Sequence, residues 1–110
     1  MPVKVQNLFP SAGTEEETAT LLQGGSFRLE QIASYGQASA KNFWYDQADP
    51  EWVLLVRGTA TLEFEKENFV QLGAGDYLLI LAHEKHRVES TSADAVWLAI
   101  HFNNSAALKA

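Results

Sequence analysis

The sequence predicts an all-β domain, and three observations support this fold class. No long helical periodicity appears between residues 25 and 102. The five apolar residues at 52–56 form a run that is too short for a helix without a polar face, and they are rich in β-forming types. Turn-forming residues separate short segments at regular spacing, as in a β-sandwich or a small barrel. With 110 residues, of which 46% are hydrophobic, the chain can build one domain with one core.

The N-terminal segment is predicted to be extended. Its first twelve residues mix apolar side chains with two prolines, which indicates an arm that packs onto another surface, such as a sheet edge. Within 14–22, Thr14 and Glu17 fit a helical capping box, whereas Thr18 and Thr20 favour a strand. We favour the strand, because the glycine pair at 24–25 would then turn the chain into a second strand at 27–32.

The remaining strands follow from the hydrophobic pattern. The run at 52–56 is apolar on both faces, which predicts a strand buried on both sides, whereas 60–65 alternates strictly, as a half-exposed strand does. A polar hairpin tip at 66–68 and a tight glycine turn at 73–76 follow. The other strands are expected at 69–72, 77–81, 87–89 and 96–102, with a break at 82–86, a turn at 91–94 and a frayed tail at 103–110.

Strands that are apolar on both faces also bear on the oligomeric state. One small barrel has a wet outer face, so a surplus of apolar outward positions predicts a homodimer that covers them. The alternative is a two-layer sandwich whose sheets cover each other's inner faces and leave Trp52, Leu54 and Val56 partly exposed.

Charge and composition exclude several classes of function. Eight basic and fourteen acidic side chains give a formal net charge of -6, which repels nucleic acid and anionic membranes alike. The chain has no cysteine, so it offers neither disulfide, thiolate metal ligand nor cysteine nucleophile. No apolar run has the length of a signal peptide core or a membrane span. We therefore expect a cytoplasmic protein whose partners are small molecules.

Polar, ligand-capable side chains lead directly into the strand at 52–56. Glu51 stands at the mouth of this core, where a carboxylate needs a cation, a proton or hydrogen bonds. The sequence leaves a structural alternative open, in which Glu51 forms an ion pair with Arg57 or Arg87.

These residues carry a resemblance to a known family. Glu51, six intervening residues and Gly58 match the end of the first cupin motif, and the stretch from Gly75 to His86 resembles the second. The chain is similar to a group of small bacterial cupins of the conserved-barrel type, in which a Trp-Tyr-Asp-Gln stretch precedes a Glu-Trp-Val-Leu-Leu strand. The resemblance implies a single cupin domain over 1–110, with a double-stranded β-helix (jelly-roll) barrel at about 25–102, an arm at 1–24 and a tail at 103–110.

The sequence departs from the family pattern at its metal ligands. Where two histidines are usual, it offers Tyr45 and Gln47 or, with a longer spacer, Trp44 and Asp46. Leu81 and His83 replace a usual proline and glycine. The implied site for a divalent metal ion therefore consists of Glu51 and His86, Asp46 or Gln47, and His101, unless His101 is a core histidine bonded to a neighbour. Such oxygen-rich ligation favours manganese or magnesium over zinc, while nickel and iron(II) also fit.

Three functional readings follow. The chain could be a metal-dependent oxygenase or isomerase in which Tyr45 or Gln47 contacts substrate. It could be a metal-free isomerase or epimerase that uses His86 and Glu51 as an acid–base pair. It could also be a binding module without turnover, because the fold does not determine the function. Asp46, Gln47 and Asp49 have a simpler alternative as members of a solvated loop, and His83 is expected to be exposed.

Overall fold

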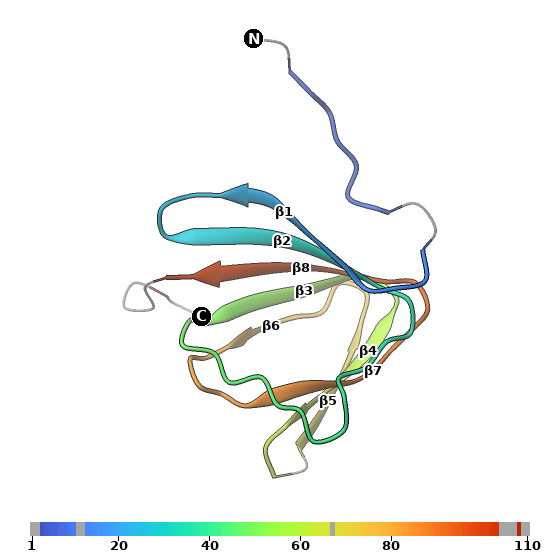
Figure 1. Ribbon diagram of the computed structural model, residues 1–110, viewed down its shortest axis with the longest axis vertical. Helices are drawn as coiled ribbons and strands as arrows, with labels where there is room; N and C mark the ends of the chain where they lie inside the picture. The colour runs from blue at the N-terminus through green and yellow to red at the C-terminus, as the bar shows by residue number, and fades with distance from the viewer. Residues whose placement is uncertain (1–2, 11–12, 67, 104–107, 109–110) are drawn as a thin grey trace.

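The computed structural model describes residues 3–10, 13–66, 68–103 and 108 of the chain (Figure 1). The described residues form eight strands and no helix, so none of them lies in a helix that could cross a membrane. The strands are β1 (Glu17–Gln23), β2 (Phe27–Ser34), β3 (Glu51–Arg57), β4 (Thr59–Phe64), β5 (Asn68–Gly73), β6 (Tyr77–Ile80), β7 (His86–Thr91) and β8 (Ala95–Phe102). Most of the expected tail, at 104–107 and 109–110, lies outside the described residues.

Two antiparallel sheets face each other. One has five strands in the order β1-β2-β8-β3-β6, and the other has three in the order β5-β4-β7. Figure 1 shows the larger sheet running from β1 to β6, with β4, β5 and β7 folded beneath it. The all-β class and the jelly-roll architecture are thus confirmed, and so is the strand expected within 14–22, which pairs with β2 across the turn at 24–25.

The core lies between the two sheets. Val53 and Leu55 of β3 point into it with Trp97 of β8 and Leu62 of β4, and all four are buried. The prediction that β3 is buried on both sides was wrong for the single chain. Its inward residues are buried, but Trp52, Leu54 and Val56 are only half-buried, because the three-stranded sheet covers one face of β3 and not the other.

The uncovered face of the five-stranded sheet carries a row of apolar side chains. The strand registers place Leu29 opposite Ile100, Ile100 opposite Trp52, and Trp52 opposite Leu79, so the row crosses four neighbouring strands. Every member of this row is half-buried. We call these four residues the apolar row.

The N-terminal arm covers part of the same face. The Leu8 carbonyl oxygen accepts a hydrogen bond of 2.7 Å from the side-chain amide of Gln31. The centroid of the Phe9 ring lies 4.8 Å from the guanidinium carbon of Arg57. Farther out, Val3 and Val5 are 93% and 90% exposed, so these two side chains are not packed against the rest of the described chain. The expectation of a packed arm therefore holds only for its inner half.

A tight turn replaces the end of the strand expected at 77–81. β6 stops at Ile80, and the Leu81 amide donates a 3.0 Å hydrogen bond to the Glu84 carboxylate. His83, at the position where the family motif has glycine, adopts a φ of 60°, and its amide donates to the Gln47 carbonyl oxygen at 2.7 Å. The turn thus keeps the left-handed conformation that favours glycine, and it fastens the 45–47 segment beside β7.

Candidate functional site

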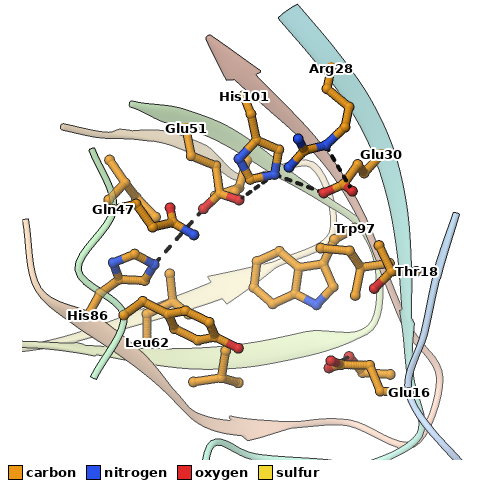
Figure 2. Close-up of a pocket in the computed structure, with 16 residues that line it drawn as sticks. Glu16, Thr18, Arg28, Glu30, Gln47, Glu51, Leu62, His86, Trp97 and His101 are labelled. Carbon is orange, nitrogen blue, oxygen red and sulfur yellow. Dashed lines mark hydrogen bonds and ion pairs between the residues drawn. The ribbon is translucent and has the colours of Figure 1, made fainter. Parts of the chain in front are cut away.

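A cavity of about 260 Å³ opens into the space between the sheets (Figure 2). Its wall combines residues of the large sheet with residues of β4 and β7. The side chains that line it include six ionisable groups besides Tyr45: Glu16, Arg28, Glu30, Glu51, His86 and His101. Trp97 and Leu62 form part of its apolar surface. The predicted pair of Glu51 and His86 therefore does converge inside the barrel.

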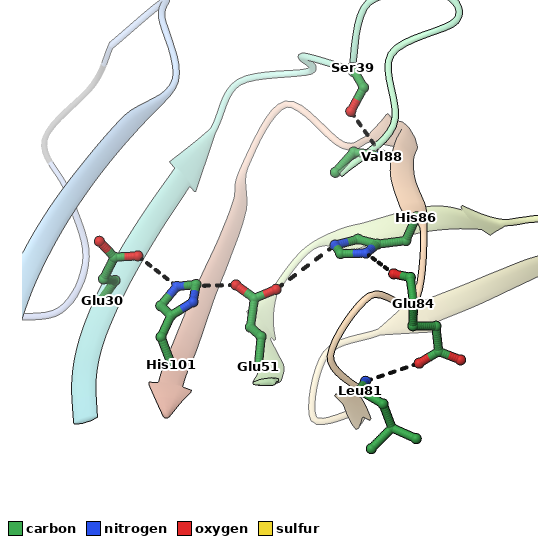
Figure 3. Close-up of polar contacts among 8 residues, drawn as sticks. All are labelled: Glu30, Ser39, Glu51, Leu81, Glu84, His86, Val88 and His101. Atoms are coloured by element: carbon green, nitrogen blue, oxygen red, sulfur yellow. Dashed lines mark hydrogen bonds and ion pairs between the residues drawn. The ribbon is translucent and has the colours of Figure 1, made fainter. Parts of the chain in front are cut away.

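Glu51 lies between two imidazoles (Figure 3). It is the first residue of β3, and its register partner on β8 is His101, so the two side chains share the inner face. Its Oε2 lies 3.2 Å from His101 Nε2, and its Oε1 lies 4.0 Å from His86 Nε2. Burial raises the pKa of Glu51, and the two histidines oppose that rise. Glu51 is therefore a carboxyl group that is protonated more readily than an exposed one.

The two histidines both present Nε2 to Glu51, but the two nitrogens differ in protonation. His86 Nδ1 lies 2.9 Å from the Glu84 carbonyl oxygen, which can only accept, so Nδ1 carries the proton and Nε2 offers a lone pair. His101 Nε2 lies within 2.9 Å of Glu30 and 3.2 Å of Glu51, so this nitrogen carries a proton. Glu51 is thus placed between a proton acceptor and a proton donor.

The strand-edge segment at 45–47 positions His86. The Tyr45 and His86 backbones exchange hydrogen bonds of 2.7 and 3.1 Å, and their rings stack with centroids 5.3 Å apart. Tyr45 and Gln47 both line the cavity, as their predicted role in contacting substrate requires. Burial, followed by the charges of Glu16 and Glu51, raises the pKa of Tyr45. Gln47 Oε1 is buried and accepts no hydrogen bond from the described residues.

Asp46 is not brought into the site. In this extended segment its neighbours point inward, so its own side chain points outward. There its Oδ1 lies 2.8 Å from Nδ1 of the exposed His83. Asp46 thus matches the solvated-loop alternative, and His83 is exposed as expected. Among the described residues, no three His, Cys, Asp or Glu side chains form a group arranged to hold a metal ion.

The structural alternative for Glu51 was wrong. Arg57 donates instead to the Asp94 carbonyl oxygen at 2.8 Å, and Arg87 pairs with Glu63 at 3.0 Å. Both arginines lie away from the cavity wall, so they leave Glu51 to the histidines. His101 lines the cavity and is bonded to Glu30 and Glu51, as expected for a core histidine bonded to its neighbours.

Sequence reasoning missed most of the wall, including the ionisable Glu16, Arg28 and Glu30 and the ring of Trp97. The available signal was the alternation of β2, whose residues 28, 30, 32 and 34 all line the cavity. That alternation shows that these residues share one face of β2, but it does not show which strand lies beside β2. Only the pairing of β2 with β8 brings Glu30 to His101, 71 positions away in the chain.

Comparison with known proteins supports the fold. A family model described as a cupin domain matches residues 31–101. A solved structure from Ralstonia eutropha JMP134, named as a candidate mannose-6-phosphate isomerase, is 37% identical, with a TM-score of 0.84 over 93% of this chain and 100% of that one. A cupin superfamily protein from Desulfitobacterium hafniense DCB-2 is 16% identical, with a TM-score of 0.74 over 86% and 84% of the two chains, and shares the fold. No curated protein matches.

Proposed function

The chain belongs to the cupin domain family, and we propose that it isomerises a small molecule in its cavity by proton transfer. One observation carries this proposal: the buried Glu51 carboxyl group lies between the proton-bearing His101 Nε2 at 3.2 Å and the His86 Nε2 lone pair at 4.0 Å. Proton transfer between neighbouring substrate atoms requires an unprotonated base and a protonated acid at the same cavity wall.

The proposed reaction moves two protons in each half. His86 Nε2 accepts a proton from the carbon beside a substrate carbonyl, while the protonated Glu51 carboxyl group donates its proton to the carbonyl oxygen, which yields an enediol. Glu51 then takes the proton of the neighbouring hydroxyl group, and His86 returns its proton to the former carbonyl carbon. The His101 N–H stabilises Glu51 while it is ionised. Tyr45 and Gln47 contact the substrate from the cavity rim.

The Ralstonia structure supports the reaction class. The name of that protein states an isomerase of a phosphorylated sugar, and aldose–ketose isomerisation is a reaction that an acid–base pair can perform. The match extends over nearly the whole of both chains, so the two barrels share their framework.

Deuterium exchange into a small panel of sugars tests this function. The protein is incubated in D₂O with mannose and fructose, each with and without a 6-phosphate, and proton NMR follows the exchange at the carbon beside the carbonyl. We expect exchange and interconversion for at least one pair. His86→Ala should slow it by about 10²-fold or more, because the base is lost. His83→Asn removes an exposed imidazole outside the cavity, keeps a residue type that tolerates the left-handed φ of 60°, and should leave the rate unchanged. Exchange that survives in His86→Ala, or none with any sugar, would refute the proposal.

Divalent metal binding is a second candidate function, favoured by the unpartnered Gln47 Oε1. The 4.0 Å between His86 Nε2 and Glu51 Oε1 exceeds a hydrogen bond, but two ligands of one ion can span it. Glu51, His86 and Gln47 therefore fit an ion that accepts one imidazole and oxygen ligands, such as manganese, iron, nickel or zinc. A bound ion would polarise a substrate oxygen as a Lewis acid. The bond of Asp46 to His83 leaves it out of this set.

Metal content distinguishes the second candidate from the first. Calorimetric titration with Mn²⁺, Fe²⁺, Ni²⁺ and Zn²⁺ is expected to show one site for at least one ion, with affinity reduced about 10-fold or more in His86→Ala and in Gln47→Ala. His83→Asn is the matched control, because asparagine tolerates the left-handed φ of this turn. Equal binding by His86→Ala would place the ion elsewhere.

We also propose that two copies pair through the apolar row. Half-buried Leu29, Trp52, Leu79 and Ile100 form a continuous stripe, which a second copy can cover by two-fold symmetry. Light scattering should then give twice the 12.2 kDa chain mass. Leu79→Arg should yield monomers, whereas Phe69→Arg, on the other sheet, should not. A monomeric parent protein would contradict this.

A further inference from the structure

We infer that the cavity takes an uncharged polyhydroxy ligand, such as an unphosphorylated sugar, and excludes phosphate esters. This inference names the substrate class for the proposed site and so rests on the proposed function. Its basis is the composition of the wall, where three carboxyl groups, those of Glu16, Glu30 and Glu51, outnumber the one guanidinium, that of Arg28.

The single arginine already has a carboxylate partner. Arg28 Nε lies 3.1 Å from Glu30 Oε2, an ion pair without hydrogen-bond geometry, and the Arg28 side chain is 43% exposed. The other oxygen of Glu30 lies 2.9 Å from His101 Nε2, and His101 also contacts Glu51 at 3.2 Å. Each cationic or proton-donating group on this side of the cavity therefore faces a carboxyl group. A phosphate dianion on Arg28 would compete with Glu30 for the same guanidinium and would lie close to its carboxylate, which repels it.

Negative charge lies on both sides of the cavity. Figure 2 shows Glu16 on the opposite side of Trp97 from the row of Glu30, His101 and Glu51. Glu16 Oε2 accepts a 3.2 Å hydrogen bond from the hydroxyl group of Ser34, and no described cation pairs with it. The charges of Glu16 and Glu51 both raise the pKa of Tyr45, which shows that their fields reach the same part of the wall. Carboxylates in a low-dielectric cleft repel an anion more strongly than they would in water.

The uncharged groups of the wall suit hydroxyl groups. Gln47 Oε1 is a buried acceptor without a donor among the described residues, and Thr18 and Ser34 offer further hydroxyl groups. Trp97 presents an apolar surface to the C–H face of a sugar ring. A volume of about 260 Å³ holds a molecule smaller than the ligands of typical drug-sized pockets. A small polyol satisfies this wall, whereas an anion does not.

Quenching of Trp97 fluorescence measures the charge selectivity directly. The double variant Trp44→Phe with Trp52→Phe leaves Trp97 as the only reporter, and acrylamide, caesium and iodide are added at constant ionic strength. Each quenching constant is divided by its value for free tryptophan. We expect the normalised quenching constant of caesium to equal or exceed that of acrylamide. The constant of iodide should be at least several-fold lower than both. Glu16→Gln should raise iodide access several-fold and leave acrylamide access unchanged. Ser90→Ala lies outside the cavity and is the control.

Every other pattern overturns the inference. Iodide access equal to that of caesium would show that the wall does not select by charge. Exclusion of both ions would assign selectivity to desolvation, and exclusion of acrylamide as well would show a cavity closed to ligands. If the double variant does not fold, the Trp97 emission is obtained as the sum of the two single variants minus the parent protein, which contains all three tryptophans. If no sugar shows deuterium exchange, the proposed reaction is refuted. The quenching measurement still tests whether the cavity excludes anions.

Discussion

Replacing Gly58 by alanine is expected to lower the free energy of unfolding by about 3 kcal/mol or more. Gly58 has a φ of +89°, which L-residues rarely adopt, and an added Cβ would lie 2.4 Å from Ser92 Oγ and 2.9 Å from Ala95 Cα. Ser92 Oγ cannot move aside freely, because it accepts a 2.9 Å hydrogen bond from the Thr59 amide and donates one of 2.8 Å to Asp94. The turn between β3 and β4 would therefore shift with the alanine.

Urea denaturation measures this loss, and Gly75→Ala separates its two causes. Gly75 has a similar φ of +94°, but no heavy atom lies within 4 Å of its added Cβ. Its variant should lose only the conformational part, about 1 kcal/mol. The difference between the two variants is the steric cost at Gly58. Equal losses would show that the contacts with Ser92 and Ala95 relax without penalty.

Glu51→Gln is expected to abolish catalysis and to stabilise the fold at neutral pH. Glutamine can neither donate nor accept the transferred proton, so the exchange rate should fall by about 10²- to 10⁴-fold. Burial raises the pKa of Glu51, so ionising it in the folded state has a cost that the amide avoids. The variant should therefore gain about 1 kcal/mol at pH 7, as substitutions of strained functional groups often do.

The stability difference between Glu51→Gln and the parent protein is expected to grow as the pH rises. The folded protein holds the Glu51 proton to higher pH than the unfolded chain, whose value is near 4.5. The parent protein therefore loses stability relative to Glu51→Gln as pH rises from the unfolded pKa through the folded one, and below both values the difference is constant. Unfolding titrations between pH 4 and pH 8 measure it. Glu63→Gln, whose carboxylate pairs with Arg87, is the control and should be less stable than the parent at pH 7. An advantage of Glu51→Gln that shrinks as pH rises would contradict the assignment.

Much of the barrel could be predicted from local patterns. The alternation at 60–65, the glycine turns and the apolar runs each specify an element through backbone geometry and side-chain period, and both properties belong to neighbouring residues. The pairing of Glu51 with His86 came from the motif resemblance. The motif resemblance could not predict which of Asp46 and Gln47 points inward. The family motif allows two spacings before Glu51, and each spacing turns a different one of these residues toward the cavity.

The sequence by itself determined the all-β class, the succession of strands along the chain and the inward position of Glu51 at the start of β3. Only the tertiary structure decided what Glu51 meets. Its partner His101 and the Glu30 and Arg28 beyond it come from strands 50 and about 20 positions away, which antiparallel pairing brings into register. The charge of the cavity depends on that register, because a shift by one residue would turn every one of these side chains to the outer face.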